Sequence, residues 1–272
     1  MTDTWLQLKD KTVIVTGGAS GLGKVISQEF LNHGANVVVC DLKSEAAEFE
    51  TSEGKVMYIV MDVTSKNSVE EMVNKVITNY GRIDILVNNA GINIPRLLVD
   101  PREPNSKYEL DEIVFDKVMN VNVKGTFFCT QAVAREMIKA GKGGVIINIS
   151  SECGLEGSEG QSVYAASKNA INSFTRSWAK ELGRLGIRVV GVAPGILEKT
   201  GLRTKEYEEA LAYTRGIEVE ELRAGYNKLS TIPLGRVGKL KEVADLVCYL
   251  GSERASYIHG VTINITGGKT RG

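Results

Sequence analysis

Short apolar runs rich in β-branched residues alternate with longer amphipathic stretches along the 272 residues of this sequence. The first run, Thr12–Thr16, is typical of a strand buried on both faces of a sheet. Apolar residues between the runs recur at helical spacing, as in Val69, Met72 and Val73. We predict strands at Thr12–Thr16, Asn36–Cys40, Val56–Met61, Ile83–Val87, Val145–Ile149, Ile187–Val192 and Val261–Ile265. The alternation predicts an α/β fold, a doubly wound and mostly parallel sheet with helices on both faces.

The chain has no Pro- or Ser-rich linker and no internal repeat, so we predict one domain spanning residues 1–272. Two segments depart from the alternation. Residues 92–108 are rich in Pro, Arg and Asp and predict a surface loop, the substrate loop. The lid, residues 196–230, is highly charged over most of its length and predicts one or two exposed helices. Because ligands of doubly wound sheets bind at the carboxyl ends of the strands, we expect both segments to line a substrate pocket.

Composition argues against several classes of partner. The formal net charge is zero, so no overall field recruits nucleic acid or an anionic membrane, and an anionic substrate needs a local basic cluster. We find no secretion signal and no apolar run that could span a bilayer. The cysteines lack CxxC spacing, which predicts reduced and mostly buried thiols in a cytoplasmic protein. Two widely separated histidines predict no metal site.

A glycine-rich turn follows the first predicted strand and precedes a helical pattern. Gly17, Gly21 and Gly23 form a GxxxGxG motif that also contains Ser20 and Leu22. Glycines permit a tight turn and let backbone N–H groups approach a pyrophosphate, whose charge the N-terminus of the following helix stabilises. Such a turn alone is weak evidence, but its position between strand and helix predicts a dinucleotide-binding site.

Asp41, which follows the second predicted strand, indicates which dinucleotide binds. A carboxylate at this position can bond both ribose hydroxyls of the adenosine half and would repel a 2′-phosphate. Ser20 is neutral, so it offers no cation to that phosphate. The two residues favour NAD over NADP. Read alone, Asp41 is also typical of a turn at a strand end.

Two further strand ends are candidates for cofactor contact. Asp62 and Val63 follow the third strand, where they could contact the adenine. Asn89, Ala90 and Gly91 follow the fourth strand, where they could pack the loop beneath the cofactor. Either segment, read alone, is also typical of a simple turn.

A serine, a tyrosine and a lysine carry the predicted chemistry. Ser151 follows the fifth strand, and Tyr164 and Lys168 share one helix face at i and i+4. Lowering the pKa of a tyrosine from about 10 to about 7 needs roughly 4 kcal/mol, which an ammonium about 4 Å away supplies at an effective dielectric near 20. Tyr164 could then remove the proton of an alcohol as hydride leaves, while Ser151 holds the substrate oxygen. A YxxxK pair alone is usually two surface residues, and the register with the glycine turn and Asp41 makes it specific.

Together these residues resemble the short-chain dehydrogenase/reductase superfamily. The motifs TGGASGLG, NNAG, VAPG and the spacing from Ser151 to YAASK match its pattern across nearly the whole chain. The resemblance implies a single-domain Rossmann-type fold with a seven-stranded parallel sheet. It adds Asn122 to the catalytic set, where it would hold a water that links Lys168 to solvent, and it gives Lys168 a contact with the nicotinamide ribose. On sequence grounds alone, Asn122 is also typical of a helix kink or cap.

The turn after the sixth strand departs from that pattern. The superfamily usually carries a Thr five positions after the Pro of the PG turn, and here that position, counted from Pro194, is Lys199, with Thr200 following. Two arrangements stay open beyond the Pro194–Gly195 turn. Either the backbone bulges, or backbone groups of Ile196 and Thr200 hold the carboxamide of the cofactor. Lys199 could instead point at the substrate.

More narrowly, the chain resembles the sorbitol-6-phosphate 2-dehydrogenase group of this superfamily. The likeness rests on variable, substrate-lining stretches, namely NIPRLLVD, GLEGSEGQSVYAASK, VAPGILEKTGLRTKEYEEALAYTRG and ERASYIHGVTINITGGKTRG. It implies that sorbitol 6-phosphate and NAD give fructose 6-phosphate and NADH. Members of the superfamily are usually dimers or tetramers, so the resemblance also implies a homo-oligomer.

A phosphorylated substrate requires Arg or Lys in the pocket. Arg96 and Lys199 stand out because the fold places both of their loops over the nicotinamide. Taken singly, each candidate is more typical of a solvated surface charge. The other cationic candidates are Arg203, Lys269 and Arg271. The candidates for contacts with sugar hydroxyls are Glu152, Glu156 and Gln161.

Two other functions remain open from the sequence. One is a reductase for an unphosphorylated ketose or for a 3-oxoacyl thioester, which dependence of KM on the substrate phosphate would separate. The other is a regulator that binds NAD without chemistry. The presence of Ser151, Tyr164 and Lys168 argues against the regulator.

Overall fold

A computed structural model of the chain describes residues 5–42, 48–50, 54–227 and 231–270. Within these ranges the chain forms a seven-stranded sheet in the order β3-β2-β1-β4-β5-β6-β7, and every pairing is parallel. The strands are β1 (Thr12–Thr16), β2 (Asn36–Asp41), β3 (Lys55–Val60), β4 (Ile85–Asn88), β5 (Gly144–Ile149), β6 (Ile187–Pro194) and β7 (Thr262–Ile265). The predicted fold class is therefore confirmed.

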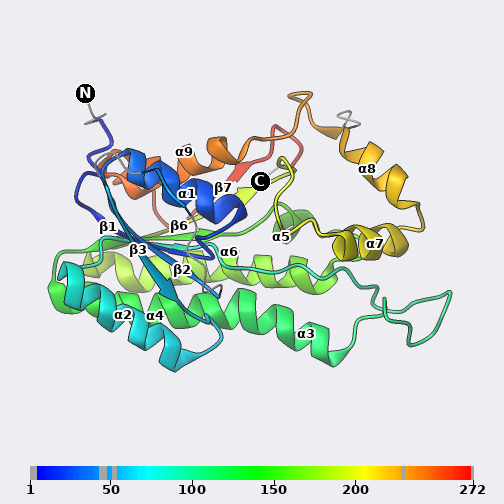
Figure 1. Ribbon diagram of the computed structural model, residues 1–272, viewed down its shortest axis with the longest axis horizontal. Coiled ribbons are helices and arrows are strands. Elements are labelled where there is room, and N and C mark those ends of the chain that lie inside the picture. Colours follow the sequence, from blue (N-terminus) through cyan, green and yellow to red (C-terminus); the bar gives the residue numbers. More distant parts are fainter. Residues whose placement is uncertain (1–4, 43–47, 51–53, 228–230, 271–272) are drawn as a thin grey trace.

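Helices cover both faces of this sheet (Figure 1). On one face lie α1 (Gly21–Asn32) and α9 (Leu240–Gly251), and on the other lie α2 (Lys66–Tyr80), α4 (Thr126–Ala140) and α6 (Ser162–Leu182). Each face has its own apolar core. In β1, Val13 and Val15 pack into the first core and Ile14 into the second, because successive side chains of a strand point to opposite faces. This explains why Val13, Ile14 and Val15 are apolar in succession.

The strand order reverses between β1 and β4, which are neighbours in the sheet. The chain leaves β1 toward β2 on one side and leaves β4 toward β5 on the other. Connections that diverge in this way open a crevice at the carboxyl ends of the two strands. The glycine-rich turn after β1 and the NNAG segment after β4 therefore meet at the place where a doubly wound sheet binds its ligand.

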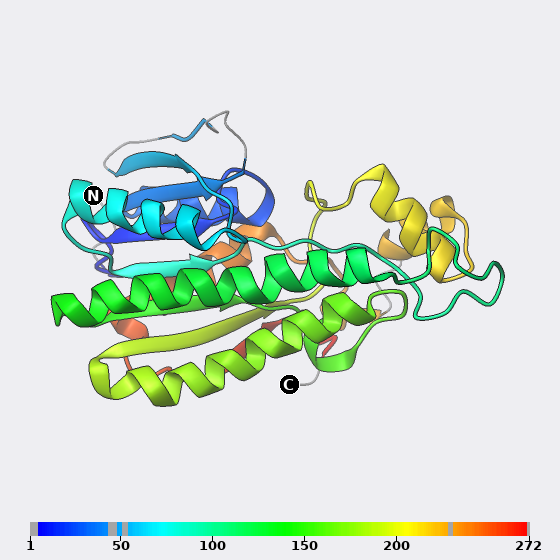
Figure 2. The ribbon, with the colours of Figure 1, turned by 90° about the horizontal axis from the view of Figure 1, so that it is seen from below.

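Several segments extend beyond the carboxyl ends of the strands. The lid contains two helices, α7 (Lys205–Thr214) and α8 (Val219–Asn227), but α7 is not the exposed helix that we predicted, because it buries one side, including Glu208 and Leu211. Residues 92–111, between β4 and α3 (Glu112–Met119), lie beside α7 in both views (Figures 1 and 2). The short elements are a π-helical segment (Asn120–Gly125), α5 (Cys153–Glu156) and two 3₁₀ turns (Gly183–Leu185 and Glu253–Ala255). Among the described residues, no helix is both long enough and apolar enough to cross a membrane.

Candidate active site

Asn89 ties the glycine-rich turn to the crevice between β1 and β4. Its Nδ2 donates to the carbonyl oxygens of Thr16 at 3.0 Å and of Gly17 at 3.1 Å. A Cβ at position 23 would lie 2.1 Å from the Gly17 carbonyl oxygen and 2.5 Å from Asn89 Nδ2, so only glycine fits there. The turn thus leaves the backbone N–H groups at the N-terminus of α1 uncovered by side chains. Backbone N–H groups in this arrangement can bind a pyrophosphate.

The lid reaches this turn through Thr200. A Cβ at Gly21 would lie 3.5 Å from the Cβ of Thr200, so the residue after Lys199 packs against the start of α1. Ser20 is the N-cap of α1 but its side chain makes no capping hydrogen bond. Leu22 is half-buried and packs against the core beneath α1. Of the predicted cofactor residues, Ser20, Gly21 and Thr200 therefore lie together.

Asp41 ends β2 beside the same turn. Its Oδ2 accepts a hydrogen bond from the backbone N–H of Ala19 at 3.1 Å, and Gly18 N donates to the carbonyl oxygen of Cys40 at 3.2 Å. The carboxylate is half-buried, so part of it stays accessible to a ligand. Asp41 therefore shapes the turn and also places a negative charge where the adenosine ribose of a dinucleotide would lie.

The segment after β6 is pinned on several sides. The carbonyl oxygen of Pro194 accepts from Glu152 N at 3.0 Å, Gly195 N donates to Ile265 O at 3.0 Å, and the carbonyl oxygen of Ile196 accepts from Gly238 N at 2.9 Å. These bonds hold the start of the lid against β5, β7 and the segment that leads into α9.

The segment after β3 has a clear local role. Asp62 Oδ1 accepts from the backbone N–H and the hydroxyl of Thr64, each at 2.8 Å, which closes a turn before α2. Val63 is buried, and a Cβ at Gly125 would lie 2.8 Å from its Cγ2. Both side chains stabilise the turn, and cofactor contact by this segment stays a prediction.

Ser151, Tyr164 and Lys168 meet where β5 ends and α6 begins. Ser151 and Lys168 are buried, while Tyr164 is half-buried. Lys168 Nζ lies 5.7 Å from the centroid of the Tyr164 ring and donates to the carbonyl oxygen of Ile149 at 2.8 Å. The hydroxyl of Ser150 donates to the carbonyl oxygen of Lys168 at 2.9 Å. The first turns of α6 are thereby fixed to the carboxyl end of β5.

Burial of this group affects the protonation of both Tyr164 and Lys168. Burial raises the pKa of Tyr164 in the protein alone, with the charges of Cys153 and Glu152 adding to the rise and Ser151 opposing it. Burial also lowers the pKa of Lys168 to about 8. Desolvation therefore opposes ionisation of Tyr164 in the protein alone, and stabilisation of its phenolate by Lys168 stays a prediction.

Asn122 connects this group to the NNAG segment. It lies in the π-helical segment and is buried, with its Oδ1 accepting from Ile92 N at 2.8 Å and its Nδ2 donating to Ile92 O at 2.9 Å and to Ser167 Oγ at 3.0 Å. A Cβ at Gly91 would lie 3.3 Å from Asn122 Oδ1 and 3.4 Å from Lys168 Nζ. Helix irregularities of this kind often occur at functional sites. Asn122 therefore positions the segment next to Lys168, and the water that the family resemblance assigns to it stays a prediction.

The substrate loop joins the catalytic region at Arg96. Arg96 N donates to the carbonyl oxygen of Gly160 at 2.7 Å, next to Gln161. Gln161 is buried, and its Nε2 donates to the Tyr207 hydroxyl at 2.8 Å while its Oε1 accepts from Cys153 Sγ at 3.7 Å. Burial raises the pKa of Tyr207, and the charges of Tyr226 and Tyr164 contribute. Arg96, Gln161 and Tyr207 of the lid therefore belong to one connected group next to the start of α6.

Glu152 and Glu156 lie against the end of the chain. Glu152 Oε1 accepts from Lys269 Nζ at 2.8 Å, and its Oε2 accepts from the Thr270 hydroxyl at 3.0 Å. Glu156 lies 3.8 Å from the same ammonium. The carboxylate of Glu152 and the ammonium of Lys269 therefore form an ion pair with each other. Arg271 lies outside the described residues.

Lys199 and Arg203 both form ion pairs with one carboxylate that no sequence pattern indicates. Glu208 of α7 is only 2% exposed and forms ion pairs with Arg203 at 3.3 Å, Arg223 at 2.9 Å and Lys199 at 4.0 Å. Glu208 and Arg223 looked like two more charges in an acidic and basic stretch, so no sequence signal distinguished them.

A second unforeseen contact joins the substrate loop to the lid. The buried carboxylate of Asp100 accepts hydrogen bonds from the hydroxyls of Tyr213 and Ser106, each at 2.7 Å. Arg102 donates to the Tyr213 carbonyl oxygen at 2.6 Å, and Tyr108 stacks on Tyr213 with ring centroids 4.0 Å apart. The loop and the lid, predicted as separate segments, form one connected cover.

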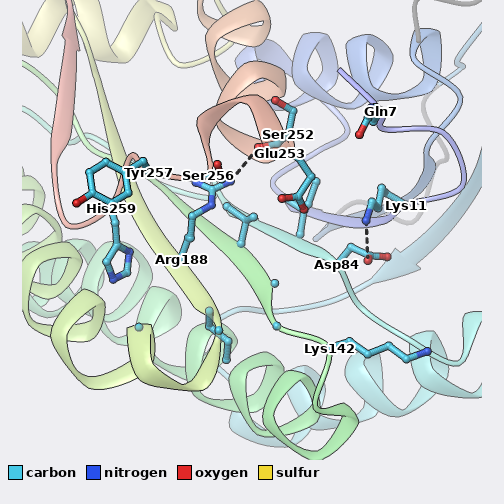
Figure 3. Close-up of a pocket in the computed structure, with 18 of the residues that line it drawn as sticks. Gln7, Lys11, Asp84, Lys142, Arg188, Ser252, Glu253, Ser256, Tyr257 and His259 are labelled. Atoms are coloured by element: carbon cyan, nitrogen blue, oxygen red, sulfur yellow. Dashed lines mark hydrogen bonds and ion pairs between the residues drawn. The ribbon is translucent and has the colours of Figure 1, made fainter. Parts of the chain in front are cut away.

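A cavity of about 670 Å³ lies at the other end of the sheet, where β4, β5 and β6 begin (Figure 3). Lys11 pairs with Asp84 at 3.7 Å in its wall. Arg188 donates to the carbonyl oxygens of Leu250, Ser252 and Ile258. None of the predicted site residues lines this cavity. The predicted chemistry therefore belongs to the carboxyl ends of the strands.

The chain was then compared with known proteins. The family model described as short chain dehydrogenase matches residues 11–211. Sorbitol-6-phosphate 2-dehydrogenase from Klebsiella pneumoniae is 60% identical over 270 residues, which cover 99% of this chain and 100% of that protein. A 3-oxoacyl-[acyl-carrier-protein] reductase from Thermotoga maritima is 41% identical and covers 97% of this chain and 99% of its own length.

A solved structure agrees with these sequence matches. The ligand-free aldohexose dehydrogenase from Thermoplasma acidophilum superposes with a TM-score of 0.81 at 27% identity, covering 97% of this chain and 95% of that one. An enzyme of this kind uses a nicotinamide cofactor, and the bare turn at Gly23, the carboxylate of Asp41 and the contact of Thr200 with Gly21 fit one. The family model, the full-length relatives and the fold agree, and the chain belongs to the short-chain dehydrogenase family.

Proposed function

We propose that this enzyme oxidises sorbitol 6-phosphate to fructose 6-phosphate with NAD as the oxidant. The observation that carries the proposal is the 60% identity, over essentially the full length of both chains, to the sorbitol-6-phosphate 2-dehydrogenase of Klebsiella pneumoniae. Asp41 supports NAD over NADP because its carboxylate lies beside the glycine turn and would repel a 2′-phosphate.

The roles of the site residues follow from their positions. Tyr164 removes the proton of the substrate hydroxyl, and Ser151 donates a hydrogen bond to the same oxygen as charge develops. When bound, the oxidised nicotinamide accepts the hydride and adds positive charge beside the phenol. Lys168 supplies the second positive charge, because its Nζ lies 5.7 Å from the ring centroid. Both charges would oppose the effect of burial, which raises the pKa of Tyr164 in the protein alone.

The pocket above these residues favours a polar substrate. The residues joined to the start of α6 include Arg96 from the substrate loop, Gln161 and the phenol of Tyr207 from the lid. Sugar hydroxyls can exchange hydrogen bonds with an amide and a phenol. The extended acyl chain of a thioester would find less complementarity there.

A substrate panel tests the proposal. Purified enzyme is incubated with NAD or NADP and with sorbitol 6-phosphate, sorbitol, other polyols and their phosphates, and reduction of the nicotinamide is followed by absorbance. We expect the highest kcat/KM for sorbitol 6-phosphate with NAD. A higher value for an unphosphorylated polyol would reject the phosphate assignment, and no turnover with any compound would favour a regulator that binds NAD.

The 41% identity to a 3-oxoacyl reductase supports a second candidate function. The same preparation is therefore assayed in the reducing direction with a 3-oxoacyl thioester and NADH or NADPH. Faster reduction of the thioester than of fructose 6-phosphate would select this candidate.

We also propose that the enzyme is cytoplasmic and forms a homo-oligomer, either a dimer or a tetramer. Analytical ultracentrifugation tests the oligomeric state.

A further inference from the structure

The lid contains a buried carboxylate that faces three cations. Glu208 Oε1 lies 3.3 Å from Arg203 and 4.0 Å from Lys199, and its Oε2 lies 2.9 Å from Arg223. The carboxylate is 2% exposed, whereas the side chains of Arg203, Arg223 and Lys199 are 20%, 50% and 65% exposed. The cations are therefore fixed from the inside and open to solvent on the outside.

The charges in this group do not balance. Burial alone would raise the pKa of Glu208, but Arg223, Lys199 and Arg203 together keep it below its usual value, so the carboxylate is ionised at neutral pH. One negative charge then faces three positive charges, which leaves an excess of two. A dianion such as a phosphate monoester would complete the balance.

The Nε of Arg203 lacks a hydrogen-bond acceptor among the described residues. This nitrogen is buried, while the guanidinium lies 3.6 Å over the ring of Tyr226. A buried donor without an acceptor costs free energy, so native structures usually supply one. An oxygen-rich ligand that shifts this side chain slightly would do so.

The group lies close to the proposed chemistry. Glu208 follows Tyr207 in the sequence, and the hydroxyl of Tyr207 accepts a hydrogen bond from Gln161. Gln161 in turn lies about one helical turn before Tyr164. On its other side Lys199 precedes Thr200, which packs against Gly21 of the cofactor turn. In Figure 1, α7 and α8, the helices of Glu208 and Arg223, lie beyond the strand end that carries α5 and the start of α6.

We propose that Lys199, Arg203 and Arg223, held in place by Glu208, bind the phosphate of the substrate. The inference rests on the proposed function and deepens it by locating the phosphate subsite in the lid and by adding Arg223 to it. The rival position is Arg96, whose guanidinium donates to the Pro95 carbonyl oxygen at 2.7 Å and has no carboxylate partner within 4 Å among the described residues. At that position Arg96 and Lys107 lie 6.0 Å and 4.8 Å from the ring centroid of Tyr108, and no buried carboxylate orients them as Glu208 orients the lid cations.

Selectivity between sorbitol 6-phosphate and sorbitol tests the subsite. In Arg223→Ala, we expect the ratio of the two kcat/KM values to fall about tenfold, as for one charged hydrogen bond. The loss should appear in KM for sorbitol 6-phosphate and not in its kcat. Inorganic phosphate, used as an inhibitor competitive with sorbitol 6-phosphate, should bind about tenfold more weakly. Arg223→Lys, which keeps the charge, should recover part of the loss.

Lys205→Ala is the matched control. Lys205 begins α7 and pairs with Glu209 on the surface at 3.6 Å, so its loss removes one lid cation outside the subsite. We expect the wild-type selectivity ratio in this variant. Thermal unfolding and NAD binding confirm that each variant is folded, and Arg223→Gln replaces Arg223→Ala if the alanine variant unfolds.

The outcomes separate this inference from the proposed function. If wild-type enzyme shows no preference for the phosphorylated substrate, the proposed function fails. If it shows the preference but Arg223→Ala and Lys205→Ala behave alike, the lid subsite is wrong. If only Arg96→Ala lowers the selectivity ratio, the phosphate lies at the substrate loop, and the inference is again overturned.

Discussion

The side chain of Asn122 pairs with both backbone groups of Ile92. Its Oδ1 accepts from Ile92 N at 2.8 Å and its Nδ2 donates to Ile92 O at 2.9 Å, as a neighbouring strand would. This pairing holds the residue after Gly91 at the point where the NNAG segment passes Lys168. Because Asn122 is 1% exposed, water cannot replace its hydrogen bonds without rearrangement.

Asn122→Ala should therefore destabilise the protein as well as slow catalysis. Two backbone groups lose their partners at a buried position, so we expect the free energy of unfolding to fall by about 2–4 kcal/mol. Urea denaturation measures this. Asn79→Ala, at an exposed position of α2 where the amide bonds only to Lys75 O, is the control. A loss for Asn122→Ala as small as that of the control would show that the pairing contributes little.

Tyr164→Phe should bind NAD as the wild type does but turn over far more slowly. The change removes only the hydroxyl, and general acid–base catalysis contributes about 10²–10⁴-fold. Calorimetry measures NAD binding, and steady-state kinetics with sorbitol 6-phosphate measure kcat. Tyr257→Phe alters a fully exposed phenol and serves as the control. Residual activity above about a tenth of wild type would contradict the role given to Tyr164.

Lys168→Met should move the pH dependence of alcohol oxidation upward. A cation stabilises the phenolate, so removing it raises the pKa of Tyr164 further above its usual value, in the direction that burial already imposes. At about 6 Å and an effective dielectric near 20, the shift is about two pH units. The wild-type ammonium is charged below its pKa of about 8. The profile of kcat/KM against pH checks this, and an unchanged rising limb would rule out electrostatic coupling.

Asp41→Asn should weaken discrimination against NADP. The amide oxygen can still accept the hydrogen bond from Ala19 N, so the turn keeps its shape while the charge is lost. We expect the ratio of kcat/KM for NAD over NADP to fall at least about tenfold, since the carboxylate no longer repels the 2′-phosphate. Both cofactors are titrated at saturating sorbitol 6-phosphate. A ratio equal to that of the wild type would mean that Asp41 only shapes the turn.

Tyr213→Phe should loosen the cover of the active site. The hydroxyl lost in this variant donates to the buried carboxylate of Asp100 at 2.7 Å, and hydrogen bonds to charged groups contribute about 1.5–3 kcal/mol. Hydrogen exchange should increase in residues 97–110 and in α7 but not in the sheet. Tyr249→Phe, whose hydroxyl donates to the Arg254 carbonyl oxygen on the surface far from the lid, is the control. Equal exchange in both variants would show that loop and lid are not coupled through Tyr213.

The sequence by itself determined the sheet, the cofactor turn and the pairing of Tyr164 with Lys168. These features depend on local rules, namely continuous apolar strands, the glycines that a tight turn requires, and the i, i+4 geometry of a helix. The carboxyl ends of parallel strands also lie at one edge of the sheet, so the sequence predicts Ser151 near Tyr164.

Only the tertiary structure decided how the charged segments are used. Asp100 meets Tyr213 across 113 positions of sequence, and Glu208 is buried because α7 and α8 fold over it. Nothing local distinguishes such residues from solvated charges, because burial depends on which distant element packs above them. The same holds for Tyr164. Spacing placed a lysine beside it, but only the folded protein shows that burial raises its pKa.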